Sequence, residues 1–445
     1  MPAERLPPGP SSRLYSTYRF AKDPFGTFES CRDEYGEVFT LPILGSHAVI
    51  TGRPDLVKAI YAMPPAKVGG LLGHLMPEIL GQGSVLVLNG EPHSADRKLL
   101  MPMFHGGRIA RWGQTIAEVT RAEASRHPFG GWQSMYELGR ATSLDVILRA
   151  LFGVKEESRV AALRTAVVEF AETGAPALIF FRALRKSFAG LGPWANAMRK
   201  LDALDKLLYA EIAIKRSAPG GDDLLSMLCE ARYDDGSAMG DRQIRDQLVS
   251  LILAGHHTMA VTLAWAMHWI MADPAVRSRL EAEINGAADV SRLPYLDAVC
   301  NETLRIYPIQ PVVMRYLLQP IEFAGYQLPA GSFVGAATTL THMDPRIWPE
   351  PRTFRPERFL EKKPDMAEFF PFGGGARRCL GANFALYEMK VVIATLLKEF
   401  RLTLRSTETP RPVRQSTVTG PSGGVMISVQ PRPAQATAER LRAAV

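Results

Sequence analysis

One cysteine stands in a sequence context that could give it metal chemistry. Cys379 belongs to the segment Phe372-Gly-Gly-Gly-Ala-Arg-Arg-Cys-Leu-Gly381, which fits the pattern FxxGxRxCxG at every specified position. Consecutive glycines allow a tight loop that brings backbone amides to the sulfur. A helix predicted from Asn383 to Phe400 directs its positive N-terminal end to the same place. Both effects favour a thiolate over a thiol, and a rigidly held thiolate is a good axial ligand for haem iron.

Other interpretations of this segment make different demands. A buried structural cysteine is the simplest alternative, because free cysteines are among the most buried residues. A dinucleotide-binding turn is excluded, because Arg378 occupies the third glycine position of GxGxxG counted from Gly373. A Walker loop is excluded because no Gly-Lys-Ser/Thr follows. The remaining cysteines, at positions 31, 229 and 300, share no CxxC spacing and predict no zinc, iron–sulfur or disulfide framework.

The cysteine segment resembles the haem-binding signature of the cytochrome P-450 family, in which a cysteine thiolate ligates haem iron. The resemblance extends over roughly residues 23–429 of the chain. It implies that Cys379 is the axial ligand of haem b. It also implies that Phe372, Gly373, Arg377 and Gly381 shape the loop around the cofactor.

A second motif lies in the long helix predicted from Asp241 to Met271, within Ala254-Gly255-His256-His257-Thr258. Gly255 costs a helix about 1 kcal/mol relative to alanine, so it needs a reason, such as a kink or a groove where dioxygen and water sit. The resembled family has (Ala/Gly)-Gly-x-(Asp/Glu)-Thr here, and its threonine hydroxyl helps proton delivery to iron-bound oxygen. His257 replaces the acid in this chain. It either relays protons, since imidazole titrates near neutral pH, or only anchors the helix while water delivers the protons.

Basic side chains could hold the carboxylates of the cofactor. His93 and Arg97 lie four residues apart in a helix predicted to begin at Glu91, so both can reach one anionic group. An ordinary pair on the helix surface would have the same spacing. In the resembled family an HxxxR helix holds one haem propionate, and Arg315 is similar to the second propionate ligand. The resemblance implies that these residues and Arg377 neutralise both propionates.

A third motif combines Glu302 and Arg305, three residues apart on one helix face, with the later segment Pro356-Glu-Arg358-Phe359. A surface salt bridge, which contributes little, is the simplest explanation of the first two residues alone. The resemblance implies instead that Glu302, Arg305 and Arg358 form a buried network that steadies the cysteine loop. These roles are structural.

The substrate pocket is less clearly marked. The stretch from Lys67 to Leu88 is rich in glycine and leucine, and either shapes a pocket or forms a mobile surface loop. Ala175–Phe181 resembles the flexible lid of the family, although simple packing between helices explains it equally well. Val312 and Val313 would face the substrate, with ordinary strand burial as the alternative. With these valines, three leucines would form an apolar lining suited to a lipophilic small molecule: Leu71, Leu72 and Leu75.

The elements that must position these residues form a mainly α protein with a smaller β-rich lobe (α+β). We predict an extended N-terminal segment over residues 1–22, one integrated domain over 23–429 and a disordered tail over 430–445. A hydrophobic content of 47% and a charged content of 22% are typical of a soluble globular protein. The start of the chain is polar and proline-rich, which predicts neither a signal peptide nor a transmembrane anchor, and a cytoplasmic location. The apolar region Leu248–Met271 contains three histidines and predicts a buried internal helix.

The resemblance implies a haem-thiolate monooxygenase that hydroxylates or epoxidises its substrate with O2. No flavin or iron–sulfur motif is left to assign, so electrons should come from a separate ferredoxin with its reductase, or a flavodoxin. NAD(P)H would act only through that partner. The partner protein would dock near Arg377 and Arg378. The net charge of +7 comes without a dense Lys/Arg run, so no nucleic acid is expected. The alternatives are a peroxide-driven or redox-neutral enzyme on the same haem, and a non-catalytic haem sensor.

Overall fold

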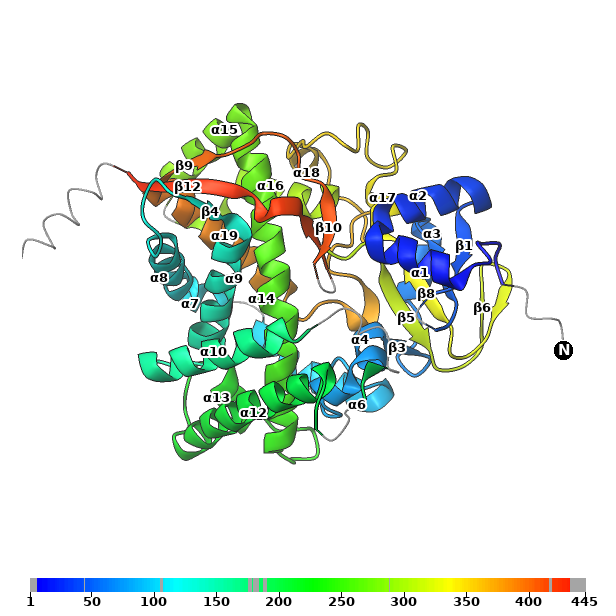
Figure 1. Ribbon diagram of the computed structural model, residues 1–445, viewed down its shortest axis with the longest axis horizontal. Helices are drawn as coiled ribbons and strands as arrows, with labels where there is room; N and C mark the ends of the chain where they lie inside the picture. The colour runs from blue at the N-terminus through cyan, green and yellow to red at the C-terminus, as the bar shows by residue number, and fades with distance from the viewer. Residues whose placement is uncertain are drawn as a thin grey trace, which may run out of the picture.

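The computed structural model describes residues 6–43, 45–104, 107–174, 178, 184–186, 190–287, 289–415 and 418–432. Helices dominate, and Figure 1 shows most of them on one side of the molecule with a β-rich lobe on the other. The helices are α1 (Arg13–Lys22), α2 (Pro24–Tyr35), α3 (Pro54–Tyr61), α4 (Leu71–Leu75), α5 (Pro77–Leu80), α6 (Gly90–Leu100), α7 (Gly107–Arg111), α8 (Gly113–Ala124), α9 (Met135–Val146), α10 (Glu157–Glu172), α12 (Pro193–Ser217), α13 (Leu224–Glu230), α14 (Asp241–Ala272), α15 (Pro274–Asn285), α16 (Pro294–Ile306), α17 (Thr338–His342), α18 (Arg358–Glu361) and α19 (Ala382–Glu399).

Among the residues that the structure describes, the strands form four small sheets. A five-stranded sheet in the order β1-β2-β8-β5-β3 builds the β-rich lobe, and only its β2–β8 pair is parallel. Two hairpins, β6–β7 and β10–β11, and a three-stranded sheet in the order β4-β12-β9 complete the set. The strands are β1 (Val38–Leu41), β2 (Ala48–Thr51), β3 (Val68–Gly70), β4 (Trp132–Ser134), β5 (Val313–Leu317), β6 (Ile321–Phe323), β7 (Tyr326–Leu328), β8 (Phe333–Ala336), β9 (Phe400–Leu404), β10 (Pro412–Gln415), β11 (Val418–Pro421) and β12 (Met426–Pro431).

Helix α14 is the central element of the helical part, and Figure 1 shows it running through the middle of the molecule. It packs against α9, α12, α16 and α19, and most of its apolar side chains belong to one large core. Its length and composition alone would allow it to cross a membrane, but 67% of its most apolar window is buried inside the protein. The burial is that of a core helix, as the sequence predicts.

Local sequence signals set many helix boundaries. The side chains of Ser134, Asp223 and Asp273 accept hydrogen bonds from the first free amides of α9, α13 and α15. Proline occupies the first position of α2 and of α16, where its missing N–H leaves no helical bond unmade. These helices therefore start where the sequence directs them to start.

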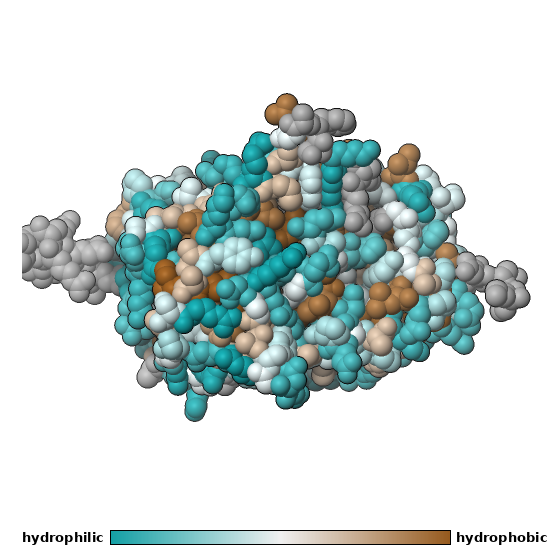
Figure 2. All heavy atoms as spheres, turned by 90° about the horizontal axis from the view of Figure 1, so that it is seen from below, coloured by the Kyte–Doolittle hydropathy of each residue, from teal (hydrophilic) through white to brown (hydrophobic). Residues whose placement is uncertain are grey.

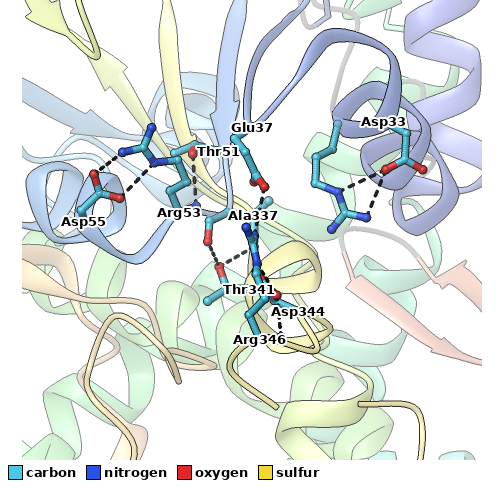
Figure 3. Close-up of polar contacts among 11 residues, drawn as sticks. Asp33, Glu37, Thr51, Arg53, Asp55, Ala337, Thr341, Asp344 and Arg346 are labelled. Atoms are coloured by element: carbon cyan, nitrogen blue, oxygen red, sulfur yellow. Dashed lines mark hydrogen bonds and ion pairs between the residues drawn. The ribbon is translucent and has the colours of Figure 1, made fainter. Parts of the chain in front are cut away.

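Polar contacts join the β-rich lobe to the chain that follows it, at the seam shown in Figure 3. The Thr341 hydroxyl of α17 donates to the carbonyl oxygen of Gly52, just beyond β2, at 2.7 Å. Arg346 donates to Glu37 at 3.0 Å and also to Asp344. The seam fixes the lobe relative to the segment that leads to the cysteine loop.

The surface is mixed in character. Figure 2 shows the lower face as mostly hydrophilic, with apolar side chains in separate small spots. Exposed large apolar residues do occur on α1, where Leu14 is 85% exposed and Tyr15 and Tyr18 are more than half exposed.

The predicted fold class is confirmed, since one mainly helical domain with a smaller β-rich lobe is observed. The extended N-terminal segment over 1–22 is wrong in its second half, because residues 13–22 form α1 with a side-chain cap from Ser12. The predicted lid at Ala175–Phe181 lies outside the described residues except for the buried Leu178. Residues 430–432 continue β12 and the segment after it, and the rest of the predicted tail lies outside the described residues.

Candidate functional site

The cysteine loop is a tight structure built on glycine. Gly373 and Gly375 have φ of 66° and 64°, in the left-handed region that glycine adopts most easily. A Cβ on Gly375 would lie 2.1 Å from the backbone oxygen of Tyr61, so only glycine fits there. The amide of Cys379 donates to the carbonyl oxygen of Phe372 at 2.9 Å and closes the loop. Helix α19 begins three residues later.

Cys379 is the one exposed cysteine, whereas the three others are buried. Although the thiol can be reached from outside, surrounding protein raises its pKa by desolvation. The amide of Gly381 and the charges of Arg378 and Arg97 oppose this rise. The loop and the helix therefore act on the sulfur as expected, but they do not by themselves hold it as a thiolate. Coordination to a metal ion would supply the remaining stabilisation.

Four basic side chains gather beside this loop. Burial, followed by the charges of Arg377, Arg97 and Arg315, lowers the pKa of His93 to about 4. Burial and then the charges of Arg315 and Arg97 lower the pKa of Arg377 to about 10. The structure thus brings together the residues that the sequence predicts to hold both propionates. The positive charges of the three arginines repel one another, as the lowered pKa values show.

Backbone contacts hold two of these arginines in place. Arg315 donates to the carbonyl oxygen of Gly374 at 2.9 Å. Arg377 donates to the carbonyl oxygen of Leu88 at 2.7 Å and to the Asn89 side chain at 2.6 Å. The amide oxygen of Asn89 is the contact that sequence reasoning missed, because it lies in an irregular loop far from the motif.

The residues present fit haem with two propionates. Within the described part of the chain, no carboxylate forms an ion pair with Arg97, Arg315 or Arg377, and buried arginines normally have such a partner. His93 also keeps a buried Nδ1 without a hydrogen-bond partner. A dianion next to a single reachable cysteine would satisfy both observations. The donor set is therefore one thiolate for iron and a basic cluster for carboxylates.

The middle of α14 contains one exposed residue within the predicted motif. Ala254 is exposed although most of the helix around it is buried. The Thr258 hydroxyl donates to the carbonyl oxygen of Ala254 at 2.7 Å and also lies 3.1 Å from that of Gly255. Gly255 has a packing reason, because a Cβ there would lie 2.9 Å from Cδ1 of Ile147. The helix continues through this turn without interruption.

His257 does not lie free beside Thr258. Its Nδ1 is 2.8 Å from the Tyr136 hydroxyl, and its Nε2 is 3.0 Å from the carbonyl oxygen of Gln415. Burial lowers the pKa of the imidazole, which keeps it neutral. Both partners are far from His257 in the sequence, so neither was predicted.

The predicted structural network is in contact and fully buried. Arg305 donates twice to Glu302, at 2.6 and 2.8 Å, and both side chains are 0% exposed. Arg358 donates to the same carboxylate at 3.3 Å and to the carbonyl oxygen of Glu350 at 2.8 Å. Arg305 also donates to the carbonyl oxygen of His342 at 2.9 Å. The network ties α16 to the chain that precedes the cysteine loop.

The predicted lining residues separate into two groups. Leu72 and Leu75 share an apolar cluster with Leu253, the residue before Ala254 on α14. Leu71 packs against this cluster as well. Val313 contacts the loop, because a Cβ on Gly373 would lie 3.3 Å from its Cγ1. Val312 is instead buried in the core of the β-rich lobe, which favours ordinary strand burial for that residue.

A buried polar network supports the helix that carries His93 and Arg97, and sequence reasoning did not find it. Asp96 accepts hydrogen bonds from Tyr233 at 2.7 Å and from Gln247 at 2.9 Å. Gln247 lies on α14 and also donates to the carbonyl oxygen of Gly83. The network fixes α6 relative to α14 and to the loop before α6.

Comparison with known proteins gives consistent matches. A family model described as Cytochrome P450 matches residues 7–433. Putative cytochrome P450 135B1 of Mycobacterium tuberculosis (strain ATCC 25618 / H37Rv) is 34% identical over 433 residues, covering 96% of this chain and 91% of the relative. Putative cytochrome P450 137 of the same strain is 34% identical over 402 residues, covering 89% and 84%. The solved structure titled Retinoic acid bound cyanobacterial CYP120A1 has a TM-score of 0.84 at 23% identity, covering 97% of this chain and 100% of that one.

Proposed function

Because the chain belongs to the cytochrome P450 family, we propose that it is a haem-thiolate monooxygenase that oxidises a lipophilic small molecule with electrons supplied by a separate protein. The observation that carries the proposal is the basic cluster beside Cys379. His93, Arg97, Arg315 and Arg377 have no carboxylate partner among the described residues, and they surround the one cysteine that can be reached.

The residues divide the work as follows. Haem, when bound, supplies the activation of dioxygen, with one oxygen atom inserted into a C–H or C=C bond and the other leaving as water. Cys379 would hold the iron and donate electron density to it. Arg97, Arg315 and Arg377 would bind and neutralise the propionates, with His93 contributing a neutral hydrogen bond.

Thr258 would hold a proton at the site. Its hydroxyl lies on the turn of α14 that includes the exposed Ala254, and it can exchange its bond to the Ala254 carbonyl for one to water. Leu72 and Val313 would exclude bulk water on either side and orient an apolar substrate.

The electron donor is expected to be a ferredoxin with its reductase, or a flavodoxin, in the cytoplasm. The guanidinium of Arg377 is held by Leu88 and Asn89 inside the basic cluster, which argues against a role in docking the donor. Arg378 remains the candidate docking residue. Reversing its charge should slow electron transfer from the donor, and an unchanged rate in Arg378→Glu would remove it from the interface.

A second candidate function is peroxide-driven turnover on the same haem. It is favoured by the residue before Thr258, which is His257 where the family has an acid. Both ring nitrogens of His257 are engaged in hydrogen bonds. Oxygen consumption coupled to reduced ferredoxin separates the two functions, because a peroxide-driven enzyme needs no electrons.

The first test is the absorption difference spectrum of the reduced protein with and without carbon monoxide. A strongly red-shifted Soret band that disappears in Cys379→Ser is expected. A band at the position of histidine-ligated haem would contradict thiolate ligation. A folded, haem-supplied protein with no Soret band would overturn the proposal.

A further inference from the structure

The imidazole that replaces the expected acid is fixed in one protonation form. A carbonyl oxygen can only accept, so the contact with Gln415 requires a hydrogen on Nε2 of His257. In the neutral ring Nδ1 then has a free lone pair and accepts from the Tyr136 hydroxyl. Burial raises the pKa of Tyr136 to about 12, so the phenol keeps its proton.

The two partners come from different elements, α9 and β10. Tyr136 is near the start of α9, whose first turn is capped by the Ser134 side chain. The rings of Tyr136 and His257 meet edge to face, with centroids 5.6 Å apart. Gln415 is the last residue of β10, in the hairpin β10–β11. His257 therefore links α9, α14 and the hairpin through one side chain.

The hairpin lies directly on the part of α14 that carries Thr258. A Cβ on Gly420 would lie 3.1 Å from Cγ2 of Val261, less than one turn after Thr258. The amide of Thr419 donates to the carbonyl oxygen of Ile309 at 2.9 Å, in the segment that leads to Val312 and Val313. A shift of the hairpin would therefore change the packing next to the Thr258 turn and next to the segment that leads to Val312 and Val313.

The residue directly before Gln415 in β10 contacts the N-terminal helix. Arg414 donates to the carbonyl oxygens of Phe20 at 3.2 Å and Ala21 at 3.1 Å, at the C-terminal end of α1. Its guanidinium also lies 5.0 Å from the centre of the Phe20 ring. Neighbouring residues of β10 thus bind α1 and α14.

A proton relay through His257 would have no outlet in this arrangement. A relay would take a proton at Nδ1 from Tyr136 and release one at Nε2. The hydrogen-bond partner of Nε2 is the backbone carbonyl oxygen of Gln415, which cannot pass a proton on. Turning the ring toward Thr258 would break both hydrogen bonds at once.

We infer that Tyr136 and His257 form a fixed clasp that positions the β10–β11 hairpin against the Thr258 turn, and that protons reach the site without passing through His257. Tyr136 is thereby a positioning residue. The consequence for proton delivery rests on the proposed function, whereas the clasp itself does not.

Substitutions at position 257 separate the two roles. A glutamine at this position can extend its amide N–H to the Gln415 carbonyl, but it cannot carry a proton at neutral pH. His257→Gln should therefore keep the clasp and abolish a relay. His257→Ala removes both, Tyr136→Phe removes only the hydroxyl, and Tyr209→Phe makes the same change at an exposed tyrosine on α12.

The clasp is tested by hydrogen–deuterium exchange of the full-length, haem-loaded protein, followed by mass spectrometry over residues 412–421. Exchange should be about threefold faster or more in His257→Ala and Tyr136→Phe, and unchanged in His257→Gln and Tyr209→Phe. Unchanged exchange in His257→Ala would overturn the clasp. This readout needs no turnover, so it holds whether or not the proposed reaction is correct.

Proton delivery is tested by oxygen consumption driven by NADPH, ferredoxin reductase and ferredoxin, in H2O and in D2O. His257→Gln should keep the rate and the solvent isotope effect of the parent protein, while Thr258→Ala should change both. A loss of about 100-fold in His257→Gln, the amount that a lost general acid typically causes, would overturn the inference.

Discussion

The backbone N–H of Cys379 donates to the carbonyl oxygen of Phe372 across 2.9 Å, so a main-chain hydrogen bond joins the two ends of the cysteine loop. The loop turns at the glycines at 373 and 375 and rests on Tyr61. Its geometry is therefore a property of the folded chain, and the thiol position should be sensitive to backbone changes.

The glycines of the motif should differ sharply in their tolerance of substitution. Gly375→Ala places a Cβ 2.1 Å from the Tyr61 backbone oxygen and strains a φ of +64°. We expect a loss of about 3 kcal/mol or more in the free energy of unfolding, together with poor haem incorporation. Gly381→Ala is the matched control, since a Cβ there has nothing within 4 Å. Urea unfolding and haem content measure both variants, and equal behaviour would contradict this view of the loop.

Arg97 should have opposite effects on the protein without haem and on haem binding. Its charge lowers the pKa values of His93, Arg315 and Arg377, which shows repulsion within the cluster. Arg97→Met should therefore leave the haem-free protein as stable or more stable. Haem affinity should fall about tenfold to a hundredfold, the size of a lost charge-assisted hydrogen bond.

Thermal unfolding of the haem-free protein and haem titration check the two effects of Arg97→Met separately. Arg242→Met removes an exposed arginine from α14 and should change neither quantity. A haem affinity unchanged in Arg97→Met would show that Arg97 is not a propionate ligand.

Breaking the buried network should be costly in a way that a surface pair is not. Glu302→Gln leaves Arg305, which is 0% exposed, without its countercharge. We expect a loss of about 3–5 kcal/mol in the free energy of unfolding. Asp202→Asn breaks the exposed pair with Lys206 and should cost less than about 1 kcal/mol. Chemical denaturation gives both values, and a small effect at Glu302 would mean that the network contributes little.

A buried carboxyl group on α19 predicts a pH dependence of stability. Burial raises the pKa of Glu388 from 4.5 to about 8, and one of its oxygens has no partner. The native state therefore keeps a proton that the unfolded chain loses near pH 4.5. Stability from this group is complete below that pH and is lost as the pH rises toward 8, with a slope of about 1.4 kcal/mol per pH unit.

Glu388→Gln should remove this slope. The variant should be more stable than the parent protein near pH 8, and the difference should shrink toward pH 5, as measured by urea unfolding at several pH values. A constant difference across the range would show that Glu388 does not change its protonation on unfolding.

Much of the site could be predicted because its motifs are local. The cysteine loop, the Ala254–Thr258 turn and the Glu302–Arg305 pair each depend on residues within one turn or one loop. The structure shows the loop closed and the pair in contact, but Gly255 does not kink α14. The fold class followed from the resemblance of these motifs to the cytochrome P-450 family. In each of these features the interacting residues lie close together in the sequence.

The missed contacts depend on chain packing over long distances. Tyr136 is 121 residues from His257, and Asn89 is 288 residues from Arg377, so no spacing rule connects them. Helix α1 was missed because prolines precede it, although Ser12 supplies an N-cap.

The contact of Arg414 with the end of α1 also has a consequence for how the protein is made. Arg414 and Phe20 are 394 residues apart, so the ribosome must synthesise nearly the whole chain before α1 receives this cap. At about 5–20 residues per second, that interval lasts roughly 20–80 seconds. During this time the nascent N-terminus carries Phe20, which is buried in the folded protein, without the Arg414 side chain that packs on its ring.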